Sequence, residues 1–161
     1  MNGNRILRIV LIAAQTQIVV AALIIGGAVN MGIITISPDL IPPPEGADLT
    51  TEEGLLKAAP LMQPKHFLMP WLAHALGTLV SGFLAAWWAP SIRHYSHFIP
   101  GGLFFIGGLM MVFMIPAPWW FIAADLALAY FPMAYLGNKM SYWIKPNDSG
   151  LNHKTTGDLV R

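Results

Sequence analysis

Two ionisable side chains stand inside stretches of sequence that are otherwise apolar. His74 falls in the run from Phe67 to Ala89, and Asp125 falls in the run from Trp119 to Leu136. An ionisable group within a membrane-spanning helix costs about 2.5–3.5 kcal/mol on insertion scales, so each is a candidate functional residue. At about 1.5 Å of rise per residue, both lie roughly 9–10 Å from the outer ends of their runs. We therefore predict that the two side chains are within about 4 Å of each other, directly or through one water.

An imidazole beside a carboxylate is compatible with several roles. The pair could relay a proton, bind a polar group of a substrate, or contribute to a metal site. It could equally be a structural hydrogen bond that fixes helix order, worth about 0.6–2 kcal/mol. Two ligands do not make a zinc site, which needs three or four, and the chain has no cysteine. One intramembrane histidine also argues against two-histidine haem ligation, so no metal and no cofactor is expected.

Further polar residues fall at the same depth or on the same helix face. Thr78 and Ser81 follow His74 at i+4 and i+7, and Asn30 lies near the outer end of the first apolar run. With His74 and Asp125 they form the candidate polar site inside the membrane. The alternative is tight helix packing, with the hydroxyl groups bonded to the backbone of their own helix and Asn30 joining two helices.

Small residues and one proline predict where helices meet or bend. Gly77 and Ser81 form a small-xxx-small pair, and Gly101 and Gly108 lie on one helix face, so these positions suit close helix contacts. Pro132 lies inside the fourth apolar run. Its ring blocks the hydrogen bond to the carbonyl four residues earlier and predicts a kink.

The composition identifies the environment that these residues require. Apolar types make up 55% of the 161 residues and charged types only 11%, against roughly 25% charged in soluble domains. The chain is therefore predicted to be an integral membrane protein, with the lipid bilayer as its first partner. Its net charge of +1 excludes the basic surface of a nucleic-acid-binding protein.

Hydropathy predicts an all-α, four-helix membrane bundle in a single domain of residues 1–144. The predicted spans are about 9–31, 67–89, 98–115 and 119–136, with a long outer loop at 37–66 and a flexible cytoplasmic tail at 145–161. Within the loop, Thr50 and Glu53 have the spacing of a capping box, which predicts a short surface helix over 51–59. Residues 1–28 loosely imitate a cleavable signal, but their apolar run exceeds the usual length of about 7–15 residues.

Basic residues predict the orientation. With both termini cytoplasmic, seven lysines and arginines face the cytoplasm and two face outward. All six tryptophans then fall at the ends of spans, where this side chain prefers the membrane interface.

Three segments carry a resemblance to a known family. They are Ala73–Val80 (AHALGTLV), Met114–Phe121 (MIPAPWWF) with Asp125-Leu126, and Ala129–Gly137 (AYFPMAYLG). The chain resembles a family of small bacterial multi-span membrane proteins with no assigned function, over its last three spans. The resemblance implies a location in the bacterial inner membrane, and it implies no substrate, cofactor or catalytic residue.

Two classes of function follow as hypotheses. The first is a non-enzymatic accessory subunit or an oligomeric small-solute carrier, with a homo-oligomer or a larger membrane complex as partner. The alternative is a membrane-embedded enzyme acting on a lipid or quinone, with His74 and Asp125 as acid and base. An enzyme or carrier needs a cavity that reaches His74 and Asp125, whereas a structural module needs the pair sealed.

Overall fold

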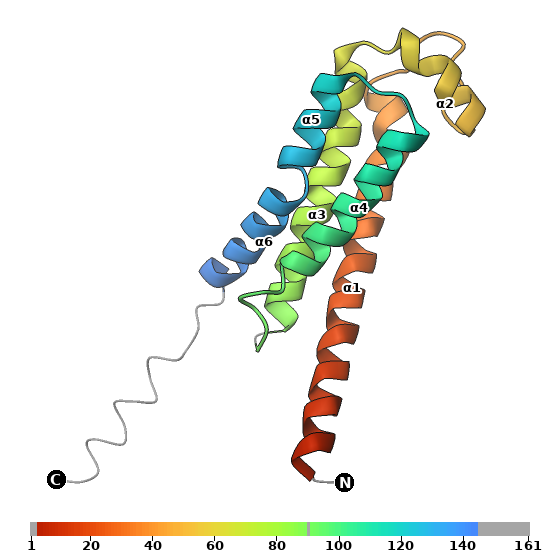
Figure 1. Cartoon of the computed structure of the whole chain (residues 1–161). Coiled ribbons are helices and arrows are strands. Elements are labelled where there is room, and N and C mark those ends of the chain that lie inside the picture. The colour runs from red at the N-terminus through yellow and green to blue at the C-terminus, as the bar shows by residue number, and fades with distance from the viewer. Residues whose placement is uncertain (1–2, 90, 145–161) are drawn as a thin grey trace, which may run out of the picture.

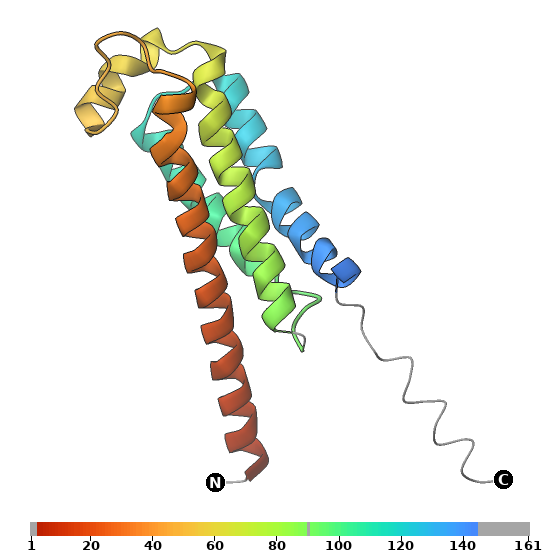
Figure 2. The ribbon, with the colours of Figure 1, turned by 180° about the vertical axis from the view of Figure 1, so that it is seen from behind.

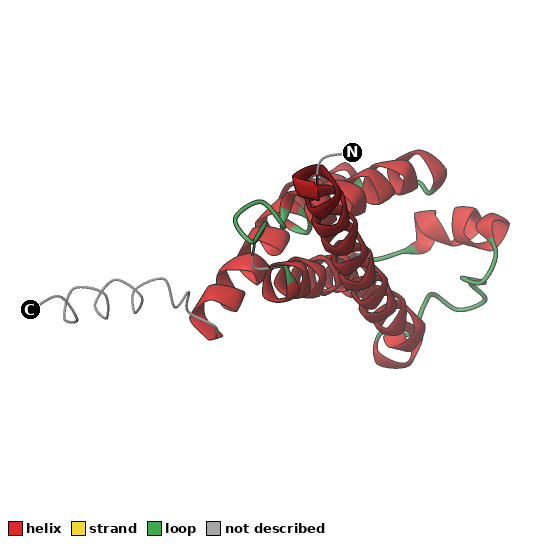
Figure 3. Cartoon of the chain, turned by 90° about the horizontal axis from the view of Figure 1, so that it is seen from below, coloured by secondary structure: helices red, strands yellow, loops and turns green. Residues whose placement is uncertain are grey.

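The described part of the chain is entirely helical. The structure, a computed structural model, describes residues 3–89 and 91–144, and these residues form helices, turns and loops without a strand (Figure 3). The predicted tail at 145–161 lies outside the described residues. The elements are α1 (Gly3–Leu40), α2 (Glu52–Ala58), the short 3-10 helices η1 (Ala59–Leu61) and η2 (Pro64–Phe67), α3 (Leu68–Trp88), α4 (Phe98–Met114), α5 (Trp119–Leu128) and α6 (Phe131–Ile144).

Three of the helical segments are long and apolar enough to cross a membrane. They are Ile9–Leu40, Pro64–Trp88, and Trp119–Ile144, which combines α5 and α6. The apolar helix α4 has 17 residues and is shorter than these. The all-helical class and the membrane-protein composition are thus confirmed, and three of the four predicted spans have the required length.

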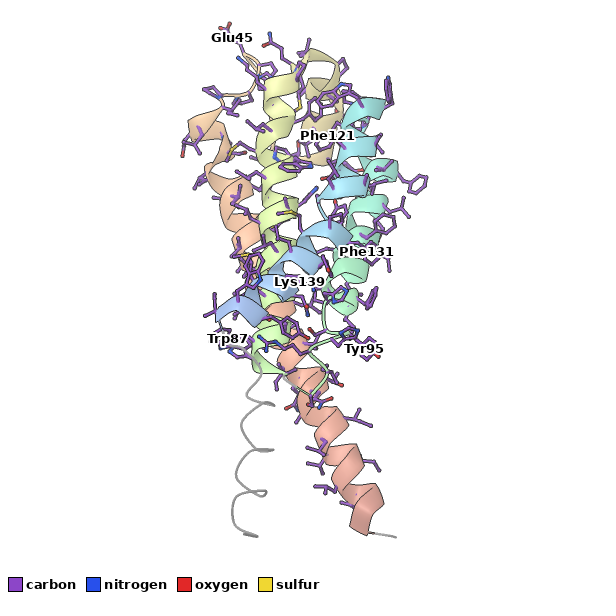
Figure 4. The ribbon with its side chains drawn as sticks, turned by 90° about the vertical axis from the view of Figure 1, so that its left-hand side faces the viewer. Glu45, Trp87, Tyr95, Phe121, Phe131 and Lys139 are labelled. Carbon is purple, nitrogen blue, oxygen red and sulfur yellow. The ribbon has the colours of Figure 1, made fainter. Side chains whose placement is uncertain are left out.

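The long helices lie side by side and define two ends of the molecule. Residues 41–67, which include α2, lie together at one end, here called the cap end (Figures 1 and 2). The first residues of α1 and the last of α6 lie at the opposite, far end. Figure 4 places Glu45 at the cap end, and Trp87 and Tyr95 toward the far end.

Small residues let the helices approach closely. A Cβ atom on Gly77 of α3 would lie 2.8 Å from the carbonyl oxygen of Gly26 in α1. Between α4 and α6, a Cβ on Gly101 would lie 3.0 Å from Cδ1 of Phe131. Both predicted packing glycines therefore lie at helix contacts, where a methyl group would need its neighbours to move.

The ends of the first span differ from the prediction. The structure continues α1 from Gly3 to Leu40, so the loop begins at residue 41 rather than 37. The residues that follow Met31 are still largely apolar, including Ile33, Ile34 and Ile36, so the apolar span continues to Leu40. The Thr35 hydroxyl donates to the Met31 carbonyl within the helix, at 2.8 Å. Pro38 is accommodated close to the helix end.

The fourth span is both broken and longer than predicted. The helix ends at Leu128 and resumes at Phe131, with Pro132 in the first turn of α6. Proline fits this position because the first helical N–H groups need no partner within the helix. The span continues to Ile144 rather than residue 136, because Asn138 and Ser141 are buried and hydrogen-bonded inside the protein.

The short helix predicted in the loop is present as α2. Its N-cap is Thr51, whose hydroxyl accepts from the Gly54 N–H at 3.1 Å. The capping-box spacing had pointed to Thr50, which instead donates its N–H and hydroxyl to Asp48. Glu53 pairs with Lys57 at 2.7 Å one turn later. With Thr51 as the N-cap, the position that would close a capping box is occupied by Gly54 and not by Glu53.

Candidate functional site

His74, Asp125 and Tyr130 form one hydrogen-bonded cluster. His74 Nδ1 lies 2.9 Å from Asp125 Oδ1 and 3.0 Å from Oδ2, which confirms the predicted contact. The Tyr130 hydroxyl lies 2.6 Å from Asp125 Oδ2 and 3.0 Å from His74 Nδ1. The side chain of Asp125 is 6% exposed and that of His74 is 21% exposed, so the carboxylate is largely buried while the imidazole retains an open side.

Two helices and the break that follows one of them position this cluster. His74 lies in the second turn of α3, and Asp125 lies in the last turn of α5. Tyr130 falls in the break between α5 and α6, after the Ala129 N–H donates to the Asp125 carbonyl at 3.0 Å. The break thus turns the phenol back onto the carboxylate five residues earlier.

The donors and acceptors fix the form of the imidazole. An ionised carboxylate only accepts hydrogen bonds, so Nδ1 of His74 and the hydroxyl of Tyr130 must both donate to it. The hydrogen of a neutral His74 then sits on Nδ1, leaving a lone pair on Nε2. Nε2 has no hydrogen-bond partner among the described residues. One ring nitrogen is therefore held in place and the other is available.

Gly108 of α4 makes room for the phenol. A Cβ on Gly108 would overlap the Tyr130 hydroxyl oxygen and lie 2.5 Å from the carbon that carries it. Tyr130 is fully buried, and it packs against Ala75 and Ala129 with Trp71 and Phe105 around them. The packing role predicted for Gly108 is thus specific: its missing side chain is where Tyr130 lies.

A cavity of about 620 Å³ reaches this cluster from the cap end. Its wall includes His74 and Asp125, together with residues of α1, α4 and the cap. It exists because α4 diverges from α3 and α5 toward the cap end (Figures 1 and 2). Its wall is mainly apolar; representative residues are Ile34, Leu55, Phe67, Met111, Val112 and Phe121.

The other predicted polar residues take different positions. Asn30 lines the cavity with the pair, but no hydrogen bond joins it to His74 or Asp125 within the described part of the chain. Thr78 and Ser81 are fully buried and do not belong to the cavity wall. Thr78 donates to the His74 carbonyl at 2.7 Å, and Ser81 donates to the Ala22 carbonyl of α1 at 3.0 Å. These two hydroxyls bond to backbone carbonyls away from the cavity wall, and their membership of the polar site stays a prediction.

The sequence analysis missed Tyr130. Its participation depends on the helix break, and Pro132 two residues later was the available signal.

Residues 3–89 and 91–144 contain no group of three or more His, Cys, Asp or Glu side chains that could hold a metal ion.

A second polar cluster, also missed, lies at the far end. The buried Arg93 donates from Nε to the Ser141 hydroxyl at 3.2 Å, and its guanidinium lies 4.0 Å from the ring centre of Tyr142. Asn138 donates to the Arg93 carbonyl at 2.6 Å. Nearby, burial lowers the pKa of His97, and the charge of His94 lowers it further. These contacts tie the segment before α4 to α6.

Comparison with known proteins adds no relative to this description. No family model, curated protein or solved structure matches the chain. The functional argument therefore rests on the geometry of the His74 site and its cavity.

Proposed function

We propose that the protein takes a largely apolar molecule, a lipid or quinone, into the cavity at the cap end and exchanges a proton with its head group through His74. One observation carries this proposal: the cavity reaches a histidine whose Nδ1 is held by Asp125 while its Nε2 is unoccupied. A purely structural hydrogen bond would need no cavity beside it.

Each residue has a defined part in the proposed site. Neutral His74 accepts a proton at Nε2, and the adjacent Asp125 carboxylate stabilises the imidazolium that forms. Tyr130 holds the carboxylate from its other side at 2.6 Å, so Asp125 and Tyr130 are positioning residues. A general acid or base held in this way typically contributes about 10²–10⁴-fold to a rate.

The proposal includes a four-span topology in the bacterial inner membrane, with both termini cytoplasmic and α4 as a short span. A helix of 17 residues is at the lower limit for crossing the hydrocarbon. The first described residues of α1 and the last of α6 both lie toward the far end, away from the cap, which supports this topology (Figure 1). The cavity would then open on the outer half of the membrane.

Reporter fusions test this topology. We expect the position after Gly46 to be periplasmic and the position after Ser149 to be cytoplasmic, because basic residues favour the cytoplasmic side. Alkaline phosphatase activity reports a periplasmic fusion point, and green fluorescent protein fluorescence reports a cytoplasmic one. Both fusion points on one side of the membrane would rule out four spans.

Copurification tests whether the cavity holds an apolar ligand. We expect the protein purified from membranes to carry about one apolar molecule per chain, identified by organic extraction and mass spectrometry. Val112→Trp should remove it, because Val112 lines the cavity and the larger indole would occupy space that the ligand needs. Phe113→Trp is the matched control, since Phe113 is the next residue of α4 and is 83% exposed. Equal retention by both variants would contradict the proposal.

The second candidate is an accessory subunit or a carrier formed by oligomers. It is favoured by the N-terminal part of α1, which extends past the far end of α3 (Figures 1 and 2). Apolar side chains there, including Leu7 and Ile12, are exposed, and a partner helix could cover them. Native mass spectrometry distinguishes the two candidate functions. A stable oligomer or complex that is lost when Leu7 and Ile12 are replaced by serine would favour the accessory subunit or oligomeric carrier.

A further inference from the structure

We infer that the ligand of this cavity has an uncharged, oxygen-bearing head and a single apolar tail, as an isoprenoid quinone or quinol has. The inference rests on the proposed function and specifies the substrate class of the same site. It is carried by the charges of the cavity wall, the hydrogen-bonding groups at its inner end, and the exposure of two methionines.

The cavity wall disfavours an anionic head. The ionisable residues that line it are His66, His74 and Asp125, and no lysine or arginine of the described residues does so. Phosphate groups are usually bound by lysine, by arginine or by helix N-termini. A phosphate placed beside the Asp125 carboxylate would also bring two acidic groups together, which disfavours the charged form of both. Phospholipids and prenyl phosphates are therefore poor ligands for this wall.

The inner end of the cavity suits an oxygen that can accept or donate. When His74 is protonated, Nε2–H can donate to a quinone carbonyl. When His74 is neutral, Nε2 can accept from a quinol hydroxyl, and the proton can pass to the ring while Asp125 balances the charge. Asn30 also lines the cavity and supplies an amide donor and acceptor.

The remaining wall suits one apolar tail that leaves toward the bilayer. Met31 of α1 and Met111 of α4 both line the cavity, yet they are 61% and 41% exposed. The cavity is therefore open where these helices would face lipid. Methionine side chains are flexible and adapt to irregular ligands. A volume of about 620 Å³ is within the usual range for small-ligand sites, about 300–1,000 Å³, and would hold a head group while the tail extends outside.

The experiment compares three compounds with the same ten-carbon tail and different heads. Decylubiquinone is added to the full chain in phosphatidylcholine nanodiscs, and binding is followed by quenching of tryptophan fluorescence. Decyl phosphate and decanol are then tested as competitors. We expect saturable binding of decylubiquinone, with decyl phosphate at least about 100-fold weaker as a competitor and decanol, which lacks the ring, also weaker.

Two variants connect the binding to His74. His74→Ala should weaken decylubiquinone binding about tenfold, the effect of losing one hydrogen bond to a group that can be charged. His94→Ala, at the far end and outside the cavity wall, should leave binding unchanged. Thermal unfolding of each variant checks folding, and His74→Gln, which keeps a hydrogen-bonding side chain, should recover part of the affinity.

The experiments distinguish a failure of the quinone-type ligand assignment from a failure of the proposed function. If decyl phosphate competes as well as decylubiquinone, or if decylubiquinone does not bind although Val112→Trp removes a copurified molecule, the uncharged quinone-type head is wrong and the proposed function stands. If decylubiquinone binds wild type and His74→Ala equally, the quinone assignment at His74 is wrong. If, in addition, no copurified molecule depends on Val112, the proposed function fails as well.

Discussion

Gly137→Ala is expected to lower the free energy of unfolding by about 1–3 kcal/mol, the usual cost of overpacking, or by more. Gly137 lies where α6 crosses α3, and a Cβ there would overlap the Leu79 carbonyl oxygen and lie 2.8 Å from the Phe83 nitrogen. Both obstacles are backbone atoms, which cannot rotate away as a side chain can. Helices α3 and α6 would have to move apart. Because α3 carries His74, this movement would also disturb the contact between His74 and Asp125.

Gly102→Ala is the matched control for Gly137→Ala. Gly102 also lies within a helix, α4, but no heavy atom is within 4 Å of its added Cβ. Alanine should be neutral or stabilising there by up to about 1 kcal/mol, because glycine weakens a helix interior. Reversible unfolding in mixed detergent micelles measures both variants. Equal shifts for the two would show that the close approach of α3 and α6 does not limit stability.

The sequence was informative about the spans because hydropathy reports directly on what can face lipid. It was less informative about helix ends, since a helix can continue through polar residues that find partners, as Thr35 does within α1 and Asn138 does against Arg93. The predicted first span therefore stopped too early, and the predicted fourth span stopped before the buried polar residues of α6.

The candidate site was predictable in part for a similar reason. His74 and Asp125 could be paired because two ionisable groups at one depth in the membrane lower each other's desolvation cost, and their separation in the structure agrees. Tyr130 could not be added, because a phenol is unremarkable in a membrane helix and its direction depends on the break before Phe131. The cavity was not predictable either, because it arises from the tilt of α4, which hydropathy does not report.

Asp125 is expected to contribute strongly to ligand binding and little to the free energy of unfolding. Asp125→Asn keeps the size of the side chain and one acceptor oxygen, so Tyr130 or His74 can still donate to it. Hydrogen bonds between membrane helices average about 0.6 kcal/mol, so we expect the free energy of unfolding to change by about 1 kcal/mol or less. Binding of decylubiquinone should nevertheless fall at least about tenfold, because an amide neither fixes the imidazole nor balances its charge.

The form of His74 gives a direct readout of its contact with Asp125. In the wild type, nitrogen NMR should show hydrogen on Nδ1, because that atom lies 2.9 Å from a carboxylate that only accepts. In Asp125→Asn the amide can accept or donate, so both tautomers should appear. Asp39→Asn removes the same charge from an exposed position on α1 and should change neither the tautomer nor the binding. A wild-type His74 with hydrogen on Nε2 alone would show that Nδ1 does not donate to Asp125. Binding that is equal in Asp125→Asn would leave the contact only a structural hydrogen bond. Either result would remove Asp125 from the proposed acid–base site.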